Sequence, residues 1–341
     1  MNHCMSRKFF SNSEWFPRIF GFTETIIDVD TYIDFQENLL HSYKNHSTFS
    51  AGTFNEKTME SFPSFQNRNG GTFSIIKNMN LADPLISYSI PDNCGATFQV
   101  NSHFNCLEFI SPNQDAERGV SCYIYNNTSG SRASIATAPS LLFRNYFLTT
   151  QTGNEIQLLS NVPIPIKHGF SMINETNFVN EISFDWSNLN YYKVGVHENC
   201  QVVLKKHDDR NLSLNTSNQI VHQVFASSLD FSNPCFNTKL SEKIEGYLLE
   251  AEYKATIMAA WDNSLKYSNY PGSKNCFLVA LGADLFKAPL HIINKAILSC
   301  QELIASSGLN VALLAPENHV FLSAVNTLGD MVAESNGQIL T

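Results

Sequence analysis

Charged residues are scarce in this sequence, and basic residues are scarcer than acidic ones. Only 16% of the 341 residues are charged, and 22 Lys and Arg against 31 Asp and Glu leave a net charge of −9. Binding to a phosphate backbone needs clustered Lys and Arg, because affinity there comes from the release of counterions. Nucleic acid is therefore not an expected partner.

Long apolar runs and paired cysteines are also missing. No run reaches the length of a membrane-spanning helix, and Met1–Phe16 lacks the apolar segment of a secretory signal. The eight cysteines are dispersed and contain no CxxC pair, which argues against a zinc site or any other metal. We expect buried free thiols in a reducing compartment, a cytoplasmic location and no association with membranes.

The sequence contains enough apolar residues to build a large core. Hydrophobic residues make up 43% of the chain, and its length suits one large domain with insertions or two smaller ones. Residues 1–90 are polar and weakly periodic, and Ser61–Gly71 is a loop by its Pro, Asn and Gly content. We predict an N-terminal extension over residues 1–90 that packs on an α/β core over residues 91–341.

Several core elements follow from apolar periodicity. Alternating and β-branched residues predict strands at Ala96–Ser102 and Gln219–Leu229. Tyr191–Leu204 reads as two strands around a turn at Glu198–Asn199. Apolar residues at helical spacing predict a long helix over Thr238–Leu265, with a polar opposite face.

The C-terminal part reads as a strand, a helix and a second strand. Cys276–Leu281 and residues 309–315 are continuous apolar runs, and a helix is expected to start near Pro289 and to end before Gly308. Such a βαβ unit with uninterrupted apolar strands predicts a parallel sheet that is covered on both faces.

The loop FLVALGADLFKAP, residues 277–289, lies between this strand and this helix. Loops at the carboxyl edge of a parallel sheet bind ligands, and the N-terminus of the following helix suits a phosphate. Gly282 permits close backbone approach, whereas Asp284 would repel an anion unless it caps the helix or contacts a hydroxyl. The residues themselves leave a diphosphate loop and a plain turn both open.

A longer comparison adds a family resemblance. Residues 94–136, CGATFQVNSHFNCLEFISPNQDAERGVSCYIYNNTSGSRASIA, resemble the pattern GATFQVASQFNCLEM…PE.GVT.YE.DRTQGPACA of a macrodomain-like family of bacteria and unicellular eukaryotes. FGFTE, LFRNYF, GFSMINE, VHQVFASSL and LLEAEYKAT match other blocks of the family along the chain. The sequence thus resembles a divergent branch of the macrodomain and poly(ADP-ribose) glycohydrolase superfamily over most of its length.

The resemblance implies a three-layer α/β/α sandwich with a mixed, largely parallel sheet that binds ADP-ribose without a cofactor. Active members remove ADP-ribose from modified proteins. By position, the loops Thr128–Arg132 and Gly282–Phe286 would hold the diphosphate, with Phe286 against a ribose and Glu24 reading adenine. The ligand-binding residues implied in this way are Glu24, Asn101, Ser102, Phe104, Asn105, Thr128, Ser129, Gly130, Gly282, Ala283 and Phe286.

The sequence departs from the family pattern in these loops. Ile124 and Asn126 stand where the family has acids, and Arg132 and Asp284 alter size and charge beside the expected diphosphate. Cleavage of an N-glycosidic bond needs a carboxylate or a positioned water. The remaining candidates for this role are Asp284, Glu108 and Glu117, together with Asp115.

Each of these acids also has a structural interpretation. Glu108 can belong to the polar face of its element, Asp115 and Glu117 to a solvated loop, and Asp284 to a helix cap. Three hypotheses therefore stay open: an ADP-ribosyl hydrolase with a rearranged site, a non-catalytic ADP-ribose reader, and a scaffold that binds a protein partner. The last two would be pseudoenzymes, and a bacterial effector acting in a host cytosol fits the range of the family.

Overall fold

A mixed eight-stranded sheet forms the centre of the protein. The computed structural model describes residues 10–172, 184–234 and 238–341. The strands of the sheet, in spatial order, are β16 (Ile339–Leu340), β6 (Thr72–Ile76), β15 (Asn310–Leu314), β14 (Asn275–Val279), β7 (Thr97–Asn101), β13 (Ile220–Ala226), β10 (Val194–Gln201) and β5 (Thr53–Lys57).

The six strands from β16 to β13 are parallel, and β10 and β5 add antiparallel pairs at one edge. All seven residues of β13 are buried, as a central strand with both faces covered requires. In the predicted βαβ unit, Cys276 of β14 pairs with Val311 of β15. The continuous apolar runs therefore do form neighbouring parallel strands, as the sequence predicts.

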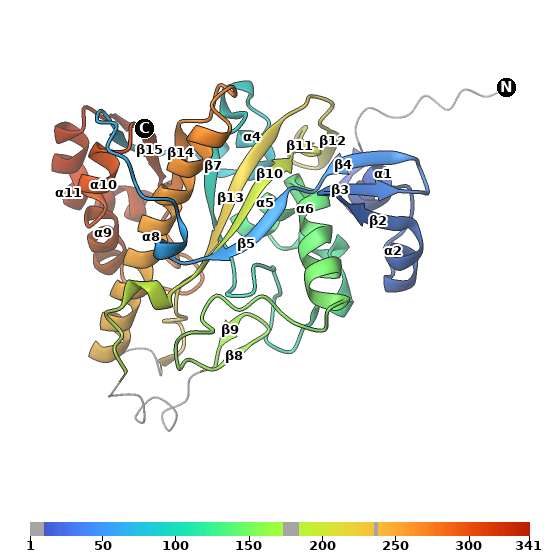
Figure 1. Ribbon diagram of the computed structural model, residues 1–341, viewed down its shortest axis with the longest axis horizontal. Coiled ribbons are helices and arrows are strands. Elements are labelled where there is room, and N and C mark those ends of the chain that lie inside the picture. Colours follow the sequence, from blue (N-terminus) through green and yellow to red (C-terminus); the bar gives the residue numbers. More distant parts are fainter. Residues whose placement is uncertain (1–9, 173–183, 235–237) are drawn as a thin grey trace.

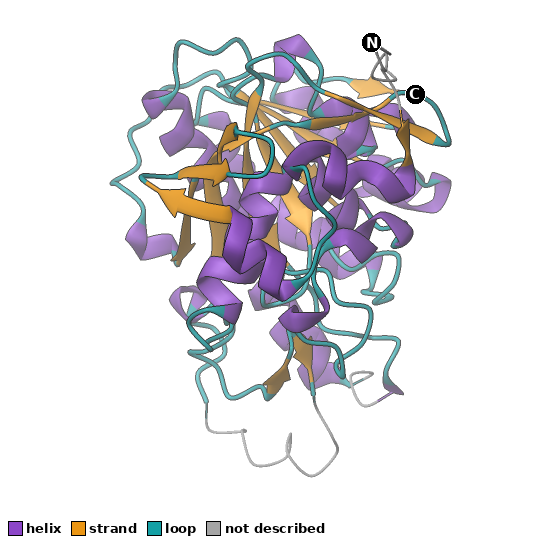
Figure 2. Cartoon of the chain, turned by 90° about the vertical axis from the view of Figure 1, so that its right-hand side faces the viewer, coloured by secondary structure: helices purple, strands orange, loops and turns teal. Residues whose placement is uncertain are grey.

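Helices cover both faces of the sheet. One group, α8 (Lys239–Lys266), α9 (Leu290–Leu298), α10 (Gln301–Ala305) and α11 (Asn318–Glu334), packs together with α8 lying on β7, β10, β13 and β14. The other group comprises α3 (Met79–Ala82), α4 (Pro84–Ser87), α5 (Ser129–Ala136) and α6 (Ala138–Leu142), followed by the π-helix η6 (Phe143–Thr150). Figure 1 shows the two groups on opposite sides of the sheet, and in the view of Figure 2 the strands lie between helices.

Smaller elements surround this core. The N-terminal part contributes α1 (Trp15–Phe20), α2 (Ile26–Tyr32) and a sheet of β2 (Ile33–Gln36), β3 (Leu39–Ser42) and β4 (Ser47–Ser50). A second small sheet joins β1 (Phe10–Ser11), β12 (Asn211–Leu214) and β11 (Leu204–Lys206), and a third joins β8 (Ile166–Lys167) and β9 (Phe170–Ser171). Short 3-10 helices lie at Asn12–Glu14, Met59–Ser61, Pro91–Asn93, Ala116–Arg118, Ser121–Tyr125 and Leu189–Tyr191.

The fold class predicted from the sequence, an α/β sandwich with a mixed and largely parallel sheet, is confirmed by this topology. The long helix is confirmed as well: α8 begins after Thr238, whose side chain accepts a hydrogen bond from the Ser241 amide. The division at residue 90 stays a prediction about domain boundaries, and the central sheet takes strands from both sides of it.

Two local predictions are wrong. The expected turn at Glu198–Asn199 lies inside β10, where the strand register shifts between His197 and Cys200 and Asn199 has a φ of 58°. A β-bulge thus replaces the turn, because an extra residue can be absorbed within a strand. The helix expected from Pro289 is divided into α9 and α10.

The described cysteines are free thiols, and all but Cys122 are buried; Cys4 and Cys235 lie outside the described residues. Within residues 10–172, 184–234 and 238–341, no helix is long and apolar enough to cross a membrane. The same residues contain no group of three or more His, Cys, Asp and Glu side chains that could hold a metal ion.

Candidate functional site

A two-lobed cleft lies at the carboxyl ends of β7 and β14. Its larger lobe has a volume of about 550 Å³ and lies among the segments 79–83, 127–132, 279–285 and 314–320, with Lys206 at its edge. Its smaller lobe has a volume of about 290 Å³ and lies among the segments 101–110, 126–128 and 285–286, with Phe170, Asp230 and Ser232. Asn101, Thr128 and Leu285 line both lobes, so the two lobes are adjacent.

The N-terminus of α5 opens into this cleft. Thr128 caps the helix, since its Oγ1 accepts a hydrogen bond from the Ser131 amide at 3.2 Å. The first backbone hydrogen bond of the helix runs from the Arg132 amide to the Thr128 carbonyl, so the amides of Ser129 and Gly130 precede the intrahelical ladder. Amides in this position attract an anion.

Gly130 allows this helix to approach the floor of the cleft. A Cβ at this position would collide with the carbonyl oxygen of Asn101 and would lie 2.5 Å from Oε2 of Glu108. The small residues of the sequence SGS thus bring the helix terminus against the end of β7.

The loop after β14 packs through Gly282 against Ser228. Gly282 has a φ of 72°, and a Cβ there would overlap the side chain of Ser228. The hydroxyl of Ser228 in turn donates to the buried carboxylate of Glu245 at 2.7 Å. The glycine is therefore needed for packing against the loop after β13, while the adjacent Ala283 and Asp284 face the larger lobe.

Glu108 is the buried carboxyl group of the smaller lobe. It is 4% exposed, and its Oε1 has no hydrogen-bond partner among the described residues. Burial raises the pKa of Glu108 to about 7, an effect that Ser102 and the positive charge of Arg144 partly offset. Ser102 lines the same wall, and its Oγ makes no hydrogen bond of ordinary geometry with any described residue. A carboxyl group with such a pKa at the floor of a cleft is suited to proton transfer near neutral pH.

Arg144 of the π-helix η6 fixes the turn that carries Glu108. Its guanidinium is fully buried and donates to the Cys106 carbonyl at 3.1 Å. Cys106 has a φ of 57°, a conformation that a non-glycine residue adopts only when its surroundings hold it. Arg144 therefore stabilises an unfavourable backbone conformation two residues before Glu108.

A neutral histidine completes the support of Arg144. The His197 ring lies 2.9 Å from a guanidinium nitrogen through Nδ1 and 2.8 Å from the Ala51 carbonyl through Nε2. Burial and the charge of Arg144 hold the pKa of His197 well below its usual range. The proton is consequently on Nε2, and Nδ1 accepts from Arg144.

The remaining predicted residues are divided between the two lobes and the interior. The larger lobe is lined by Asn101, Thr128, Ser129, Ala283 and Asp284, and the smaller lobe by Asn101, Ser102, Glu108, Thr128 and Phe286. Gly130 and Gly282 lie directly behind the lining. Phe104 and Asn105 are buried and lie behind the cleft wall, where Asn105 accepts a hydrogen bond from the Leu107 amide at 3.2 Å.

Two predicted residues lie away from both lobes. Glu24 accepts hydrogen bonds from the Val120 and Ser121 amides and from the Tyr146 hydroxyl, so in this structure its carboxylate joins the N-terminal part to the core. Glu117 is exposed in a 3-10 helix, where Asp115 serves as its N-cap. Asp284 does not cap a helix, because α9 begins six residues later, after Pro289.

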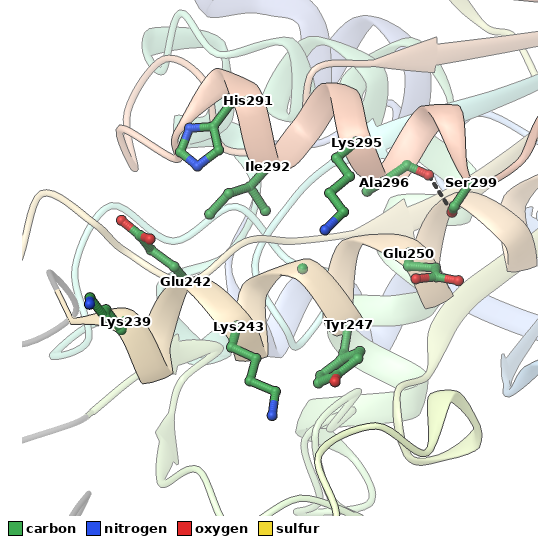
Figure 3. Close-up of a pocket in the computed structure, with 11 residues that line it drawn as sticks. Lys239, Glu242, Lys243, Tyr247, Glu250, His291, Ile292, Lys295, Ala296 and Ser299 are labelled. Atoms are coloured by element: carbon green, nitrogen blue, oxygen red, sulfur yellow. Dashed lines mark hydrogen bonds between the residues drawn. The ribbon is translucent and has the colours of Figure 1, made fainter.

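A second hollow lies between α8 and α9. This groove, of about 470 Å³, is lined by Lys239, Lys243, Tyr247 and Glu250 on α8 and by His291 and Lys295 on α9, among others (Figure 3). Its floor is formed by the buried side chains of Ile292 and Ala296. None of the residues predicted from the sequence lies there.

No family model matches the sequence, and no curated protein matches it either. The solved structures that resemble the chain include poly(ADP-ribose) glycohydrolases and a macrodomain. That of Deinococcus radiodurans poly(ADP-ribose) glycohydrolase in complex with ADP-ribose shares 9% identity over 82% of this chain and 95% of its own, with a TM-score of 0.45. That of the Thermomonospora curvata glycohydrolase shares 8% identity over 91% and 96%, with a TM-score of 0.44.

The Oceanobacillus iheyensis macrodomain with MES bound shares 8% identity over 83% of this chain and all of its own, with a TM-score of 0.39. Identities this low do not identify equivalent residues in this chain.

Several residues of the cleft are absent from the sequence-based set. Asp230 lines the smaller lobe and follows β13, so a carboxylate just after a predicted parallel strand was the signal available for it. Phe170 belongs to the GFSMINE block, whose last residues, 173–175, lie outside the described residues. Asp83 and Lys206 come from segments that carry no motif.

Proposed function

We propose that this protein binds ADP-ribose in the two-lobed cleft and acts on ADP-ribosylated protein. The observation that carries the proposal is the position of the cleft: the N-terminus of α5 and the loop after β14 line one end, and the buried carboxyl of Glu108 lies at the other. Its volume is in the range of small-ligand sites, which run from roughly 300 to 1,000 Å³.

The larger lobe is assigned to the diphosphate and nucleoside. The amides of Ser129 and Gly130 supply hydrogen-bond donors, and the helix terminus supplies partial positive charge. Arg132 and Lys206 add cations at the edge, although both lie near the buried carboxylate of Asp83, at 2.5 Å and 3.8 Å. The acid at Asp284 lies across this lobe and weakens anion binding there.

The reaction proposed is hydrolysis of the bond that joins the ribose to the target. Water adds its hydroxyl to the anomeric carbon, the bond to the target atom breaks with its electron pair going to that atom, and the remaining proton ends there. Glu108 is the group proposed to transfer that proton, because it is buried in the lobe next to the diphosphate end. Asp284 and Glu117 take no part in this step: the first faces the larger lobe and the second lies outside both.

A non-catalytic reader is the second candidate. Ile124 and Asn126 stand where the resembling family has acids, so Glu108 is left without a second carboxyl in that segment. A pseudoenzyme of this kind would bind the modified protein in a cytosol, that of a host cell included, without releasing ADP-ribose.

Calorimetric titration with ADP-ribose, with AMP and NAD as controls, tests the proposal. Ser129→Asp is the informative variant, since a carboxylate in the first turn favours the helix but repels the diphosphate. We expect micromolar binding to the native protein, roughly tenfold or greater weakening in Ser129→Asp, and little change in Ser129→Ala. If the folded native protein gives no heat of binding with any of the three nucleotides, both the hydrolase and the reader are refuted. The protein-binding scaffold is then the remaining hypothesis.

Release of ADP-ribose from modified protein then separates the two candidates. If the protein is a hydrolase, the native protein releases ADP-ribose. Glu108→Gln then still binds ADP-ribose but does not release it from modified protein. Binding without turnover in the native protein assigns it as a reader.

A further inference from the structure

Two acidic residues of α8 lie in the interior of the protein, outside the cleft. The side chains of Glu245 and Glu252 are fully buried on this helix. Among the described residues, neither carboxyl group forms a salt bridge. A buried charge without a cationic partner costs much free energy, so burial favours a proton on both acids.

Glu245 and the loop after β13 form a closed cycle of hydrogen-bonding groups. The Leu229 amide donates to Oε2 of Glu245 at 3.0 Å. The Oγ of Ser228 lies 2.7 Å from Oε1 of Glu245 and 2.9 Å from the carbonyl oxygen of Leu229. The Ser228 hydroxyl therefore has two oxygen neighbours and only one proton to donate.

A proton on Glu245 satisfies every group of this cycle. Its Oε1 then donates to Ser228 Oγ, and the Ser228 hydroxyl donates to the Leu229 carbonyl. Without that proton the hydroxyl donates to the carboxylate, the Leu229 carbonyl loses its donor, and a negative charge is buried. The pKa of Glu245 agrees with the neutral form, because burial raises it to about 7 while Ser228 and the Leu229 amide partly offset the effect.

The cycle lies directly behind the two loops of the cleft. Ser228 packs against Gly282, where an added Cβ would lie next to both Oγ and Cβ of the serine. Ala283, which follows Gly282, lines the larger lobe, and Asp230, which follows Leu229, lines the smaller lobe. A movement of Ser228 would reach both lobes, because close-packed interiors transmit strain.

Other ionisable groups surround Glu245. Burial raises the pKa of Glu252 well above its usual range, and the charge of Glu245 adds to this effect. Burial also raises the pKa of Tyr192 and of Tyr253, so both phenols stay protonated. Glu245 is thus the first of these buried groups to lose its proton as the pH rises. The ionisable groups farther out, on the loops and on α9, are exposed or half-buried: Asp230, Asp284, Lys287, His291 and Lys295.

We propose that Glu245 is a positioning residue of the cleft, and that its protonated carboxyl group holds the loops after β13 and β14 in the arrangement that binds ligand. Ionisation opens the cycle and loosens both loops, so ligand binding weakens as the pH rises through about 7. The contribution of this proton to stability has the same sign: it is present below the ordinary pKa of 4.5 and is lost as the pH rises toward about 7. The inference rests on the proposed function, since ADP-ribose is the ligand concerned.

NMR of the native protein tests the proposal without a nucleotide. The amide signals of Leu229, Gly282 and Ala283 are followed between about pH 5.5 and about pH 8.5. We expect the three signals to shift with one midpoint, near the pKa of about 7. In Glu245→Gln this titration should disappear, because the amide side chain donates to Ser228 and accepts from Leu229 at every pH.

Two further variants sharpen the assignment. Ser228→Ala removes the hydroxyl between Glu245 and Gly282, so the Leu229 signal should still titrate while the Gly282 signal no longer follows it. Glu250→Gln is the matched control, an acid-to-amide change on α8 at a residue that pairs with Lys254, and it should leave the titration unchanged.

Calorimetry with ADP-ribose at about pH 6 and about pH 8.5 measures the effect on the cleft. Glu108→Gln serves as the background, because it removes the carboxyl group of the cleft whose pKa is also about 7. We expect binding to be roughly three- to tenfold weaker at the higher pH, the equivalent of about one hydrogen bond. With Glu245→Gln added, the affinity should be the same at both pH values and match the stronger one.

The possible results separate this inference from the proposed function. A Leu229 signal that does not titrate would refute the proton on Glu245. Titration of Leu229 without Gly282 and Ala283, or an affinity that does not change with pH, would refute the positioning role. If ADP-ribose binds at neither pH while the three amide signals share a midpoint that depends on Glu245, the proposed function alone is refuted.

Discussion

The cleft at the ends of β7 and β14 and the groove between α8 and α9 are hollows of similar size, and they differ in what lies beneath them. The larger lobe of the cleft has about 550 Å³ and the groove about 470 Å³. Under the cleft lie Glu108, Ser102 and Arg144, all buried and polar. Under the groove lie Ile292 and Ala296, and charged residues that line it, such as Lys243 and Lys295, are exposed. Lys295 points from α9 toward α8 (Figure 3).

This difference separates a place built for a ligand from a surface depression. Buried polar atoms cost free energy unless something satisfies them, so their retention at the floor of a cleft needs a reason that apolar packing cannot give. Exposed lysines above an apolar floor need none, because water already satisfies them. Size alone would not have distinguished the two hollows.

Replacement of the buried Arg144 should give the largest difference in stability between the cleft and the groove. Arg144→Leu removes the hydrogen bonds to the Cys106 carbonyl and His197 and leaves Glu108 without its compensating charge. We expect a loss of about 3–5 kcal/mol in the free energy of unfolding, measured by chemical denaturation. Lys295→Leu in the groove should stay within about 0.5 kcal/mol. Similar losses in both variants would remove the energetic distinction between the hollows.

The second-largest expected effect is the pH dependence of stability that comes from Glu108. In the folded protein burial raises the pKa of Glu108 from 4.5 to about 7, so the folded state retains a proton that the unfolded state releases. Native stability from this group is present below pH 4.5 and is lost as pH rises toward about 7. Glu108→Gln should therefore gain relative to the native protein by up to about 3 kcal/mol over that window. Thermal unfolding at several pH values measures it, and a constant difference would contradict the assignment.

A glycine in the cleft gives a smaller change. Gly130→Ala should destabilise the protein by about 1–3 kcal/mol, because the added Cβ meets the Asn101 carbonyl and the Glu108 carboxylate and pushes α5 outward. The same displacement should reduce the heat of ADP-ribose binding. Denaturation and calorimetry on one preparation would show both effects, and unchanged affinity would mean that the helix terminus does not touch the ligand.

Replacing Gly246 in the groove by alanine should change the stability of the protein in the opposite direction. A Cβ on Gly246 would have Cγ2 of Ile292 as its nearest neighbour at 3.9 Å, an ordinary contact. Gly246→Ala should then stabilise α8 by about 0.5–1 kcal/mol, the usual preference of a helix for alanine. ADP-ribose binding should not change. A loss of stability here would show that the groove is packed more tightly than its geometry indicates.

Much of the fold followed from local pattern. The helical spacing of apolar residues predicted α8, and the uninterrupted apolar runs predicted the parallel pair β14 and β15. The bulge in β10 was not predictable in this way, because Glu198 pairs with Thr53 of β5, and His197 and Cys200 on either side of the bulge pair with β13. Pairing partners from distant segments decide whether such residues turn.

The candidate site was predictable only in part. The family-like blocks pointed to the loops at Thr128 and Gly282, and both lie at the cleft. They also pointed to Glu24, which lies outside both lobes and binds backbone amides of residues 120–121. The sequence did not rank Glu108 above Asp284 or Glu117 as the catalytic acid, because burial separates the three and depends on the tertiary structure.

The sequence by itself determined the α/β class and the periods of the main elements, because these depend on neighbours along the chain. Only the tertiary structure decided that Glu108, His103, Phe170 and Asp230 surround one lobe. Those side chains come from the segment after β7, from β9 and from the segment after β13, and the topology of the sheet brings them together. The proton affinity of Glu108 was likewise set by the fold, because the pKa of a carboxyl depends on how much water and which charges surround it.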